Sequence, residues 1–289
     1  MNLSELEKLI DQAAVNRVRK LDLSGMEITE IPDSIGKLVS LISLNLHNNQ
    51  ITEISDSITR LTNLTELHLG GNQITEIPDS IAKLSNLTSL DLRSSQITEI
   101  PDSIMRLTSL KRLDFQMCGL IESIPDKIVQ LDNLEDFYLT YSEISEISDS
   151  ITRMVKLKTL GFWGNRITGI PDSLAKLTNL HTLQLFQTQI TEIPDSFSKL
   201  TNLKHLDLSR NPIMKIPDSF VKLTNLHTLQ LFQTQITEIP ESIENLINLK
   251  TLNLSNNQIA KIPQGMRKLT NLKRLNLEGN PLPIAPEII

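Results

Sequence analysis

Hydrophobic residues recur along this chain with a fixed period. From residue 18 onward, apolar segments begin 23 residues apart, except for one step of 24, at Val18, Leu41, Leu64, Leu87, Leu110, Leu134, Leu157, Leu180, Leu203, Leu226, Leu249 and Leu272. In a copy such as LTELHLGGNQITEIPDSIAKLSN, residues 64–86, apolar side chains at repeat positions 4 and 6 alternate with polar neighbours, as in a half-buried strand. The pattern predicts one short strand per copy, with successive strands stacked in parallel.

Repeat position 9 is expected to lie inside the stack. Asparagine occupies it at Asn49, Asn72, Asn165, Asn211, Asn257 and Asn280. An amide can both donate to and accept from the backbone of the turn after the strand, which predicts an interior ladder of hydrogen bonds. The shorter side chains of Ser95, Cys118, Ser142, Thr188 and Thr234 replace asparagine elsewhere and can satisfy fewer backbone groups. Cys118, the only cysteine, is therefore predicted to be structural.

The second half of each copy contains a Pro-Asp-Ser segment, as at residues 78–80. Proline stops the strand, and Asp or Ser can cap a short helical turn. An acidic residue at repeat position 16 is followed four residues later by Lys or Arg in most copies, as in Asp79 and Lys83. We expect these to form ion pairs at i and i+4 on the solvent side of the turn.

The two ends of the chain differ. Residues 1–17 predict an amphipathic N-terminal capping helix, with Ser4 and Glu7 as its capping box. Residues 18–289 hold the twelve copies, of which the last is incomplete and has no C-terminal cap, since Leu282, Ile284, Ile288 and Ile289 leave it apolar. Such an end permits end-to-end association with a second copy.

The copies match the pattern LxxLxLxx(N/C)xL, and the chain resembles leucine-rich repeat proteins of the intracellular class with 23-residue repeats over residues 18–289. The resemblance implies an α/β fold: a right-handed leucine-rich-repeat solenoid, or horseshoe, with a parallel concave sheet and short helical or irregular convex turns. The segments VRKLDLSGMEITEIP and LEGNPLPIAPEII also look like the repeat region of Roco proteins, where such a segment precedes a Ras-like GTPase domain.

Composition narrows the classes of function. The single cysteine excludes a disulfide framework, and the alternation of charge with leucine in MNLSELEKLIDQAA differs from a signal peptide. A cytoplasmic protein without a membrane segment is expected. The chain contains no GxxxxGK[ST], GxSxG or HExxH motif. We therefore expect no enzyme activity, no catalytic residues, no cofactor and no metal.

Candidate binding residues are sought at repeat positions 2, 3, 5, 7 and 8 around each strand. The fold does not need the side chains at these positions for its core or its asparagine ladder. They hold five of the ten aromatic residues and all five histidines. Because aromatic side chains dominate interaction hot spots, we predict a concave site for a protein partner centred on copies six to ten. Its candidate residues are Tyr138, Tyr141, Trp163, His181, Phe186, His205, Arg210, His227 and Phe232.

Two alternatives weigh against this site. Scattered surface aromatics are normal in soluble proteins, and the segment KLTNLHTLQLFQTQITEIP occurs unchanged at residues 176–194 and 222–240. Part of the aromatic group is therefore attributable to duplication rather than to selection for a ligand.

Charge does not favour nucleic acid as the partner. The net charge of the chain is −6, and the concave positions hold eleven basic residues interleaved with eight acidic ones.

Two hypotheses for the function follow from the resemblance. The first is a sensor or scaffold region of a Roco-type GTPase. The alternative is a freestanding adaptor that binds a small GTPase or a phosphatase.

Overall fold

Short parallel strands follow one another in chain order. The computed structural model describes residues 1–283, and the chain forms two compact units, Met1–Ile144 and the part from Ser145 onward. In the first unit each strand pairs with the next in register, so that Leu44 lies opposite Leu67 and Leu67 opposite Leu90. Its strands are β1 (Lys20–Asp22), β2 (Ser43–Asn45), β3 (Glu66–His68), β4 (Ser89–Asp91), β5 (Arg112–Asp114) and β6 (Asp136–Tyr138).

The second unit repeats this arrangement. Its strands also pair in parallel and in register, each with the next. They are β7 (Thr159–Gly161), β8 (Thr182–Gln184), β9 (His205–Asp207), β10 (Thr228–Gln230), β11 (Thr251–Asn253) and β12 (Arg274–Asn276). The predicted leucine-rich-repeat solenoid with a parallel sheet is confirmed.

The core of each unit lies directly behind its strands. The leucines at repeat positions 4 and 6, such as Leu67 and Leu69, are fully buried, whereas their neighbours Glu66 and His68 are half-buried on the other side. Phe115, Phe137 and Phe162 replace these leucines and are fully buried as well. Because the alternation has period two, the remaining strand positions point outward; we call this outer side of the strands the strand face.

The asparagine ladder forms as predicted. Asn72 Nδ2 donates to the carbonyl oxygens of Leu46 at 3.0 Å and Leu69 at 2.7 Å, and its Oδ1 accepts from Ile51 N at 3.0 Å. Where Cys118 replaces asparagine it is buried and contacts Leu92 O. Burial raises the pKa of the Cys118 thiol, which disfavours the reactive thiolate.

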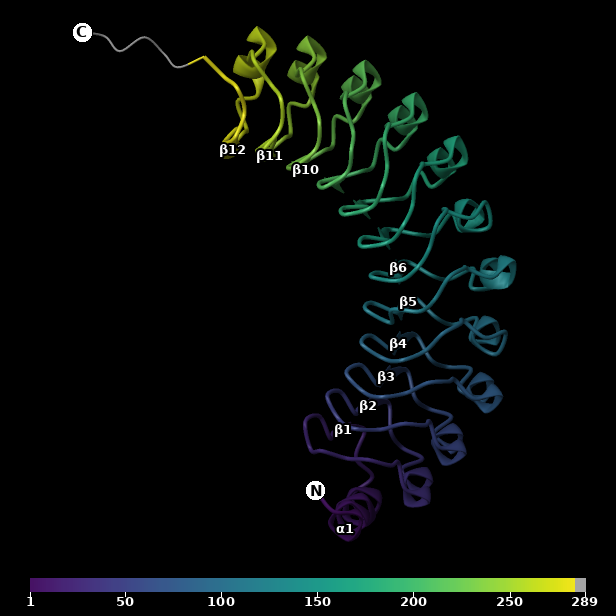
Figure 1. The fold of residues 1–289 in the computed structure, drawn as a ribbon. Helices are drawn as coiled ribbons and strands as arrows, with labels where there is room; N and C mark the ends of the chain where they lie inside the picture. The colour runs from purple at the N-terminus through teal and green to yellow at the C-terminus, as the bar shows by residue number, and fades with distance from the viewer. Residues whose placement is uncertain (284–289) are drawn as a thin grey trace, which may run out of the picture. The chain divides into compact units, whose positions relative to one another are not determined.

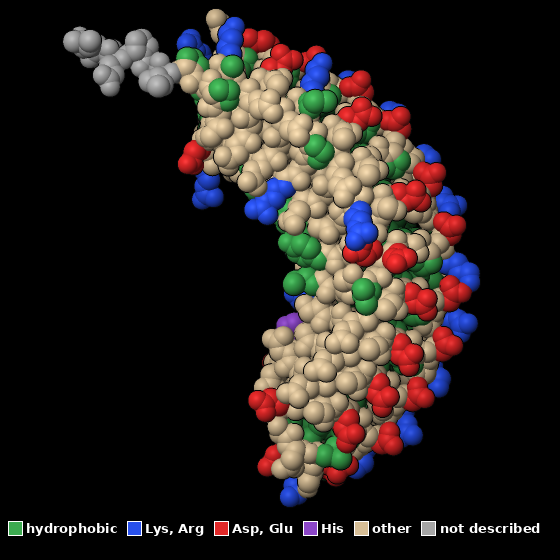
Figure 2. All heavy atoms as spheres, in the orientation of Figure 1, with side chains coloured by type: hydrophobic (Ala, Val, Ile, Leu, Met, Phe, Trp, Pro, Cys, Tyr) green, Lys and Arg blue, Asp and Glu red, His purple; other side chains and the backbone are tan. Residues whose placement is uncertain are grey.

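The turn opposite the strands is a 3-10 helix in each of the first eleven copies (Figure 1). In the first unit these turns are η1 (Asp33–Lys37), η2 (Asp56–Arg60), η3 (Asp79–Lys83), η4 (Ile104–Arg106) and η5 (Asp126–Gln130). In the second they are η6 (Ile151–Arg153), η7 (Asp172–Lys176), η8 (Asp195–Lys199), η9 (Asp218–Lys222), η10 (Glu241–Asn245) and η11 (Gln264–Lys268). Figure 2 shows acidic and basic side chains gathered along this turn side.

The expected i, i+4 ion pairs within these turns are wrong for the described residues. Lys37, which has Asp33 four residues before it, pairs instead with Asp11 near the N-terminus. Lys127 and Lys268, which have no acidic residue four positions before them, pair with Asp102 and Glu244 of the preceding copy. A 3-10 helix has about three residues per turn, so side chains four residues apart do not face each other. The charges therefore link neighbouring copies.

The N-terminal cap is a helix, α1 (Leu3–Val15), which buries Leu6, Ile10 and Ala13. Its capping box is formed by Asn2 and Glu5, not by Ser4 and Glu7. The helix begins two residues earlier than Ser4 would require, because the Asn2 amide oxygen already caps the N–H of Glu5.

At the other end, Leu275 in β12 is 44% exposed, whereas Leu252 in β11 is fully buried. Leu282 is the last of the apolar end residues in the described part, and Ile284, Ile288 and Ile289 lie outside it. Within residues 1–283 no helix is long and apolar enough to cross a membrane.

Candidate functional site

Two aromatic side chains stack on the strand face of the second unit. Trp163 follows β7 and Phe186 follows β8, and both occupy repeat position 7. Their ring centroids are 4.7 Å apart with an interplanar angle of 14°, and both residues are half-buried. Offset stacking of this kind adds about 0.5–1.5 kcal/mol beyond area burial. The register of neighbouring strands thus builds a rigid, partly exposed apolar surface.

Phe232 stands two strands from Phe186 in the same column of repeat position 7, with the small Ser209 between them. The Arg210 guanidinium lies 5.4 Å from the centre of the Phe232 ring, a cation–π contact. Arg210 Nε also donates to Gln233 Oε1 at 3.0 Å. These contacts hold Arg210 at the edge of the strand face.

Tyr138 and Tyr141 belong to the first unit. The Arg112 guanidinium lies 4.8 Å from the centre of the Tyr138 ring. Tyr141 is 38% exposed and has a φ of 47°, because repeat position 8 adopts the left-handed conformation after the strand. The predicted aromatic residues are therefore divided between the units, with Trp163, Phe186 and Phe232 in the second.

The three candidate histidines also lie in the second unit. His181 Nδ1 is 2.7 Å from Asn179 O, and His227 Nδ1 is 2.7 Å from Asn225 O. His205 and His227 have ring centroids 6.4 Å apart. Burial, followed by the charges of His227 and the nearby lysines, lowers the pKa of His205. Among residues 1–283 no three His, Cys, Asp or Glu side chains come together as a metal site.

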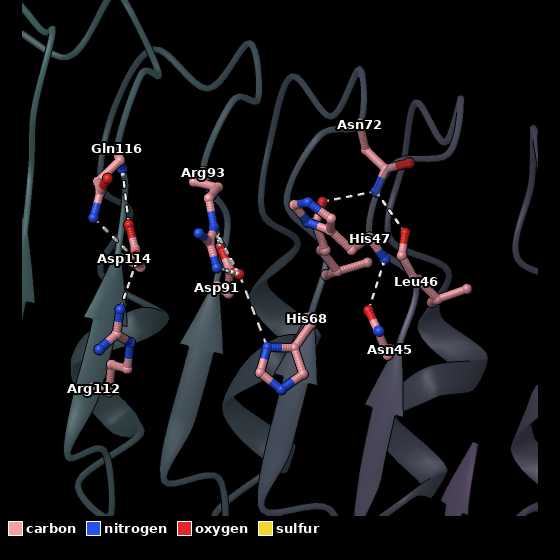
Figure 3. Close-up of polar contacts among 11 residues, drawn as sticks. Asn45, Leu46, His47, His68, Asn72, Asp91, Arg93, Arg112, Asp114 and Gln116 are labelled. Carbon is pink, nitrogen blue, oxygen red and sulfur yellow. Dashed lines mark hydrogen bonds and ion pairs between the residues drawn. The ribbon is translucent and has the colours of Figure 1, made fainter. Parts of the chain in front are cut away.

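A polar cluster on the strand face of the first unit was missed by the sequence reasoning (Figure 3). Asp91, at the end of β4, is only 3% exposed. Its carboxylate accepts from Arg93 Nε at 3.0 Å and Nη2 at 2.6 Å, and His68 Nδ1 lies 3.9 Å away. Burial opposes ionisation, but the contacts of His68 and Arg93 outweigh it and hold the pKa of Asp91 well below its usual range.

Gly70 makes room for this cluster. A Cβ atom there would lie 2.8 Å from both Arg93 Cγ and His47 Nδ1. His47, His68, Asp91 and Arg93 line one side of a hollow of about 380 Å³. The cluster could have been found by reading repeat position 7 from copy to copy, where His47, Gly70 and Arg93 succeed one another.

A second hollow, of about 270 Å³, lies on the strand face of the second unit over Asp207. Its sides are the identical strands Thr182–Gln184 and Thr228–Gln230, which the duplication places on either side of His205–Asp207. Burial raises the pKa of Asp207, although the N–H of Ser209 donates to its carboxylate at 3.0 Å. The face thus combines apolar rings, basic side chains and one half-buried acid.

Comparisons with known proteins agree with this architecture. A family model described as leucine-rich repeat region matches residues 67–149 and 145–233, and one described as leucine rich repeat matches residues 16–74 and 224–282. No curated protein sequence matched the chain.

Solved structures share the fold. The crystal structure of a TDR receptor has a TM-score of 0.81 and 30% identity, and the match covers 91% of this chain and 49% of that one. An internalin, inlF, from Listeria monocytogenes has a TM-score of 0.77 and 26% identity, covering 96% and 84%. The ectodomain of the receptor kinase GASSHO1/SCHENGEN3 from Arabidopsis thaliana has a TM-score of 0.76 and 27% identity. The match covers 92% of this chain but 39% of that ectodomain, so the chain spans well under half of its length.

Proposed function

Because the chain belongs to the leucine-rich repeat family, we propose that it is a non-catalytic module that binds a protein partner on its strand face. The observation that carries the proposal is the stacked pair Trp163 and Phe186, which is half-buried on the strand face, outside the fully buried core. Large rigid rings give contact area at a small cost in conformational entropy. The proposed binding residues are those predicted from the sequence, including Tyr138 and Tyr141 of the first unit.

One solved relative supports the use of this fold for binding. The Arabidopsis ectodomain was crystallised in complex with CASPARIAN STRIP INTEGRITY FACTOR 2. The lone, buried Cys118 suits a reducing compartment, and a cytoplasmic location is part of the proposal.

The experiment is an affinity capture from a lysate of the source cells, read by mass spectrometry. The wild-type chain is compared with a variant carrying Tyr138→Ala, Trp163→Ala and Phe186→Ala. A matched control, Met214→Ala with Ile262→Ala, removes exposed apolar side chains outside the strand face. We expect a partner that the aromatic variant loses and the control retains, with circular dichroism showing all three proteins folded. Identical captures by all three would contradict the proposal.

The wider context is proposed from the resemblance alone. The sensor or scaffold region of a Roco-type protein is our first choice, and a freestanding adaptor for a small GTPase or phosphatase is the alternative. Sequencing the natural gene beyond Ile289 separates them: a downstream GxxxxGK[ST] motif supports the first, and a stop codon supports the second.

End-to-end association through the last copy is a separate proposal, supported by the exposure of Leu275. Light scattering over a range of concentrations should show a dimer that Leu275→Glu abolishes. A strictly monomeric mass at high concentration would contradict it.

A further inference from the structure

Six basic side chains form a single file where the strands of the second unit begin. They occupy repeat position 2, and each backbone N–H donates to the carbonyl oxygen of the preceding member at 2.8 Å. Adjacent members therefore stand one strand apart, about 4.8 Å. We call them the basic column: Lys158, His181, Lys204, His227, Lys250 and Lys273.

The fold does not require basic residues at this position. In the first unit the same position holds Arg19, Ile42, Thr65, Thr88, Lys111 and Glu135, with the same backbone hydrogen bonds, such as Thr65 N to Ile42 O at 2.8 Å. Apolar, hydroxyl and acidic side chains are all accommodated there. The run of basic residues is therefore a property of the second unit and not of the repeat.

Three lysines of the column are not neutralised by ion pairs. In the described part of the chain, Lys204, Lys250 and Lys273 form no ion pair. The column is bordered by asparagines whose side chains donate to carbonyl oxygens of the preceding copy, as Asn202 does to Thr178 O at 2.8 Å. Asp207 lies three positions further along its strand than Lys204. Like charges placed in one file repel each other, so an anion bound along the column would relieve this repulsion.

The histidines of the column are oriented for such an anion. A carbonyl oxygen only accepts, so the Nδ1 atoms of His181 and His227 must donate to Asn179 O and Asn225 O. Their Nε2 atoms make no hydrogen bond within residues 1–283. When an imidazole is protonated, Nε2 becomes a second donor, which a carboxylate can accept.

We infer that the basic column receives an acidic segment of the partner protein, laid across strands β7 to β12. The inference rests on the proposed function and names the chemistry of the partner. Five strand steps span about 24 Å, which is about seven residues of extended chain. The partner would place carboxylates along the column while its apolar side chains contact Trp163 and Phe186.

The aromatic contacts favour a protein over nucleic acid. Single-stranded nucleic acid binds where bases stack on free ring faces beside a basic track. Here Trp163 and Phe186 cover each other, and Arg210 covers one face of Phe232. Five residues of strand, about 16 Å, separate repeat positions 2 and 7, and the acidic Asp207 lies between them.

The test uses fluorescein-labelled octaglutamate and octaglutamine with the full chain, followed by fluorescence anisotropy. We expect octaglutamate to bind and octaglutamine not to bind. The variant Lys204→Gln with Lys250→Gln should weaken octaglutamate binding about tenfold or more, and added salt should weaken it further. The control Lys199→Gln with Lys222→Gln removes the same charge from turns η8 and η9 and should leave binding unchanged.

Equal binding of the two peptides, or equal losses in both variants, would overturn the inference. An oligothymidine of equal charge provides a second way to overturn it. If the oligothymidine binds more tightly than octaglutamate and the column variant loses that binding, the column is a nucleic-acid site. Affinity capture separates this result from the proposed function. If the aromatic variant loses a partner that the column variant (Lys204→Gln with Lys250→Gln) still captures, binding on the strand face is supported, and the inference that the column receives an acidic segment is refuted.

Discussion

Replacing Asn72 with alanine tests the interior ladder most sharply. Asn72 is 5% exposed and makes three buried hydrogen bonds with the backbone. Leu46 O would keep a bond from Asn49 Nδ2 at 2.9 Å after the substitution. The N–H of Ile51 and the carbonyl of Leu69 would have no remaining partner among the described residues. Each orphaned buried group costs about 1–3 kcal/mol, so the two together should lower the free energy of unfolding of Asn72→Ala by about 2–6 kcal/mol.

Urea unfolding followed by circular dichroism measures this loss. Asn72→Thr should cost less, because a hydroxyl can still bond the carbonyl at position 6, as Thr188 does with Leu185 O at 3.0 Å. The control Asn63→Ala removes one exposed bond to Val39 O and should cost at most about 1.5 kcal/mol. Equal losses for Asn72→Ala and Asn63→Ala would refute the reasoning. Fluorescence of Trp163, which lies in the other unit, shows whether both units unfold together.

Three further predictions follow from single residues. Gly70→Ala should destabilise the protein by about 1–3 kcal/mol, because its Cβ would lie 2.8 Å from Arg93 Cγ. Gly169 has open space around it, so Gly169→Ala should not destabilise the protein, and thermal melts of the two variants test the difference. Met117 has a φ of 59°, so Met117→Gly should raise stability by about 1 kcal/mol, whereas Met214→Gly should lower it; an increase for both would contradict the strain argument. Folding lowers the pKa of Asp91. Its contribution to the free energy of unfolding is therefore fully present above the unfolded pKa, about 3.9, and is lost as the pH falls from there toward the lower pKa of the folded state. Asp91→Asn should therefore be less stable than wild type at pH 7, with the gap closing in acid, and a gap that does not change with pH would contradict this.

The repeat made most of the fold predictable. A period of 23 residues with alternating apolar positions places the strands, and parallel stacking in register then fixes which residues become neighbours, as Leu44 and Leu67 do. The asparagine ladder followed from the same logic, because position 9 recurs behind each strand. These features depend on local alternation and on a repeated length, both of which are visible along the chain.

The features that differ from the sequence predictions depend on three-dimensional geometry that the repeat pattern does not encode. Whether a Pro-Asp-Ser turn becomes an α-helix or a 3-10 helix decides which charges can meet within it, and Lys37 pairs with Asp11 rather than with Asp33. The cluster around Gly70 joins His47 and Arg93, which lie 46 positions apart in sequence and 23 on either side of Gly70. It is visible only when one repeat position is compared between copies.

The most direct test of partner binding on the strand face is site-specific photo-crosslinking. The photoreactive amino acid benzoylphenylalanine replaces Phe232 on the strand face in one protein and Val221, in turn η9, in another. Both are incubated with the captured partner and irradiated. The proposed function predicts a covalent adduct from position 232 and none from position 221. An adduct from position 221 alone would place the partner on the turn side and contradict the proposal.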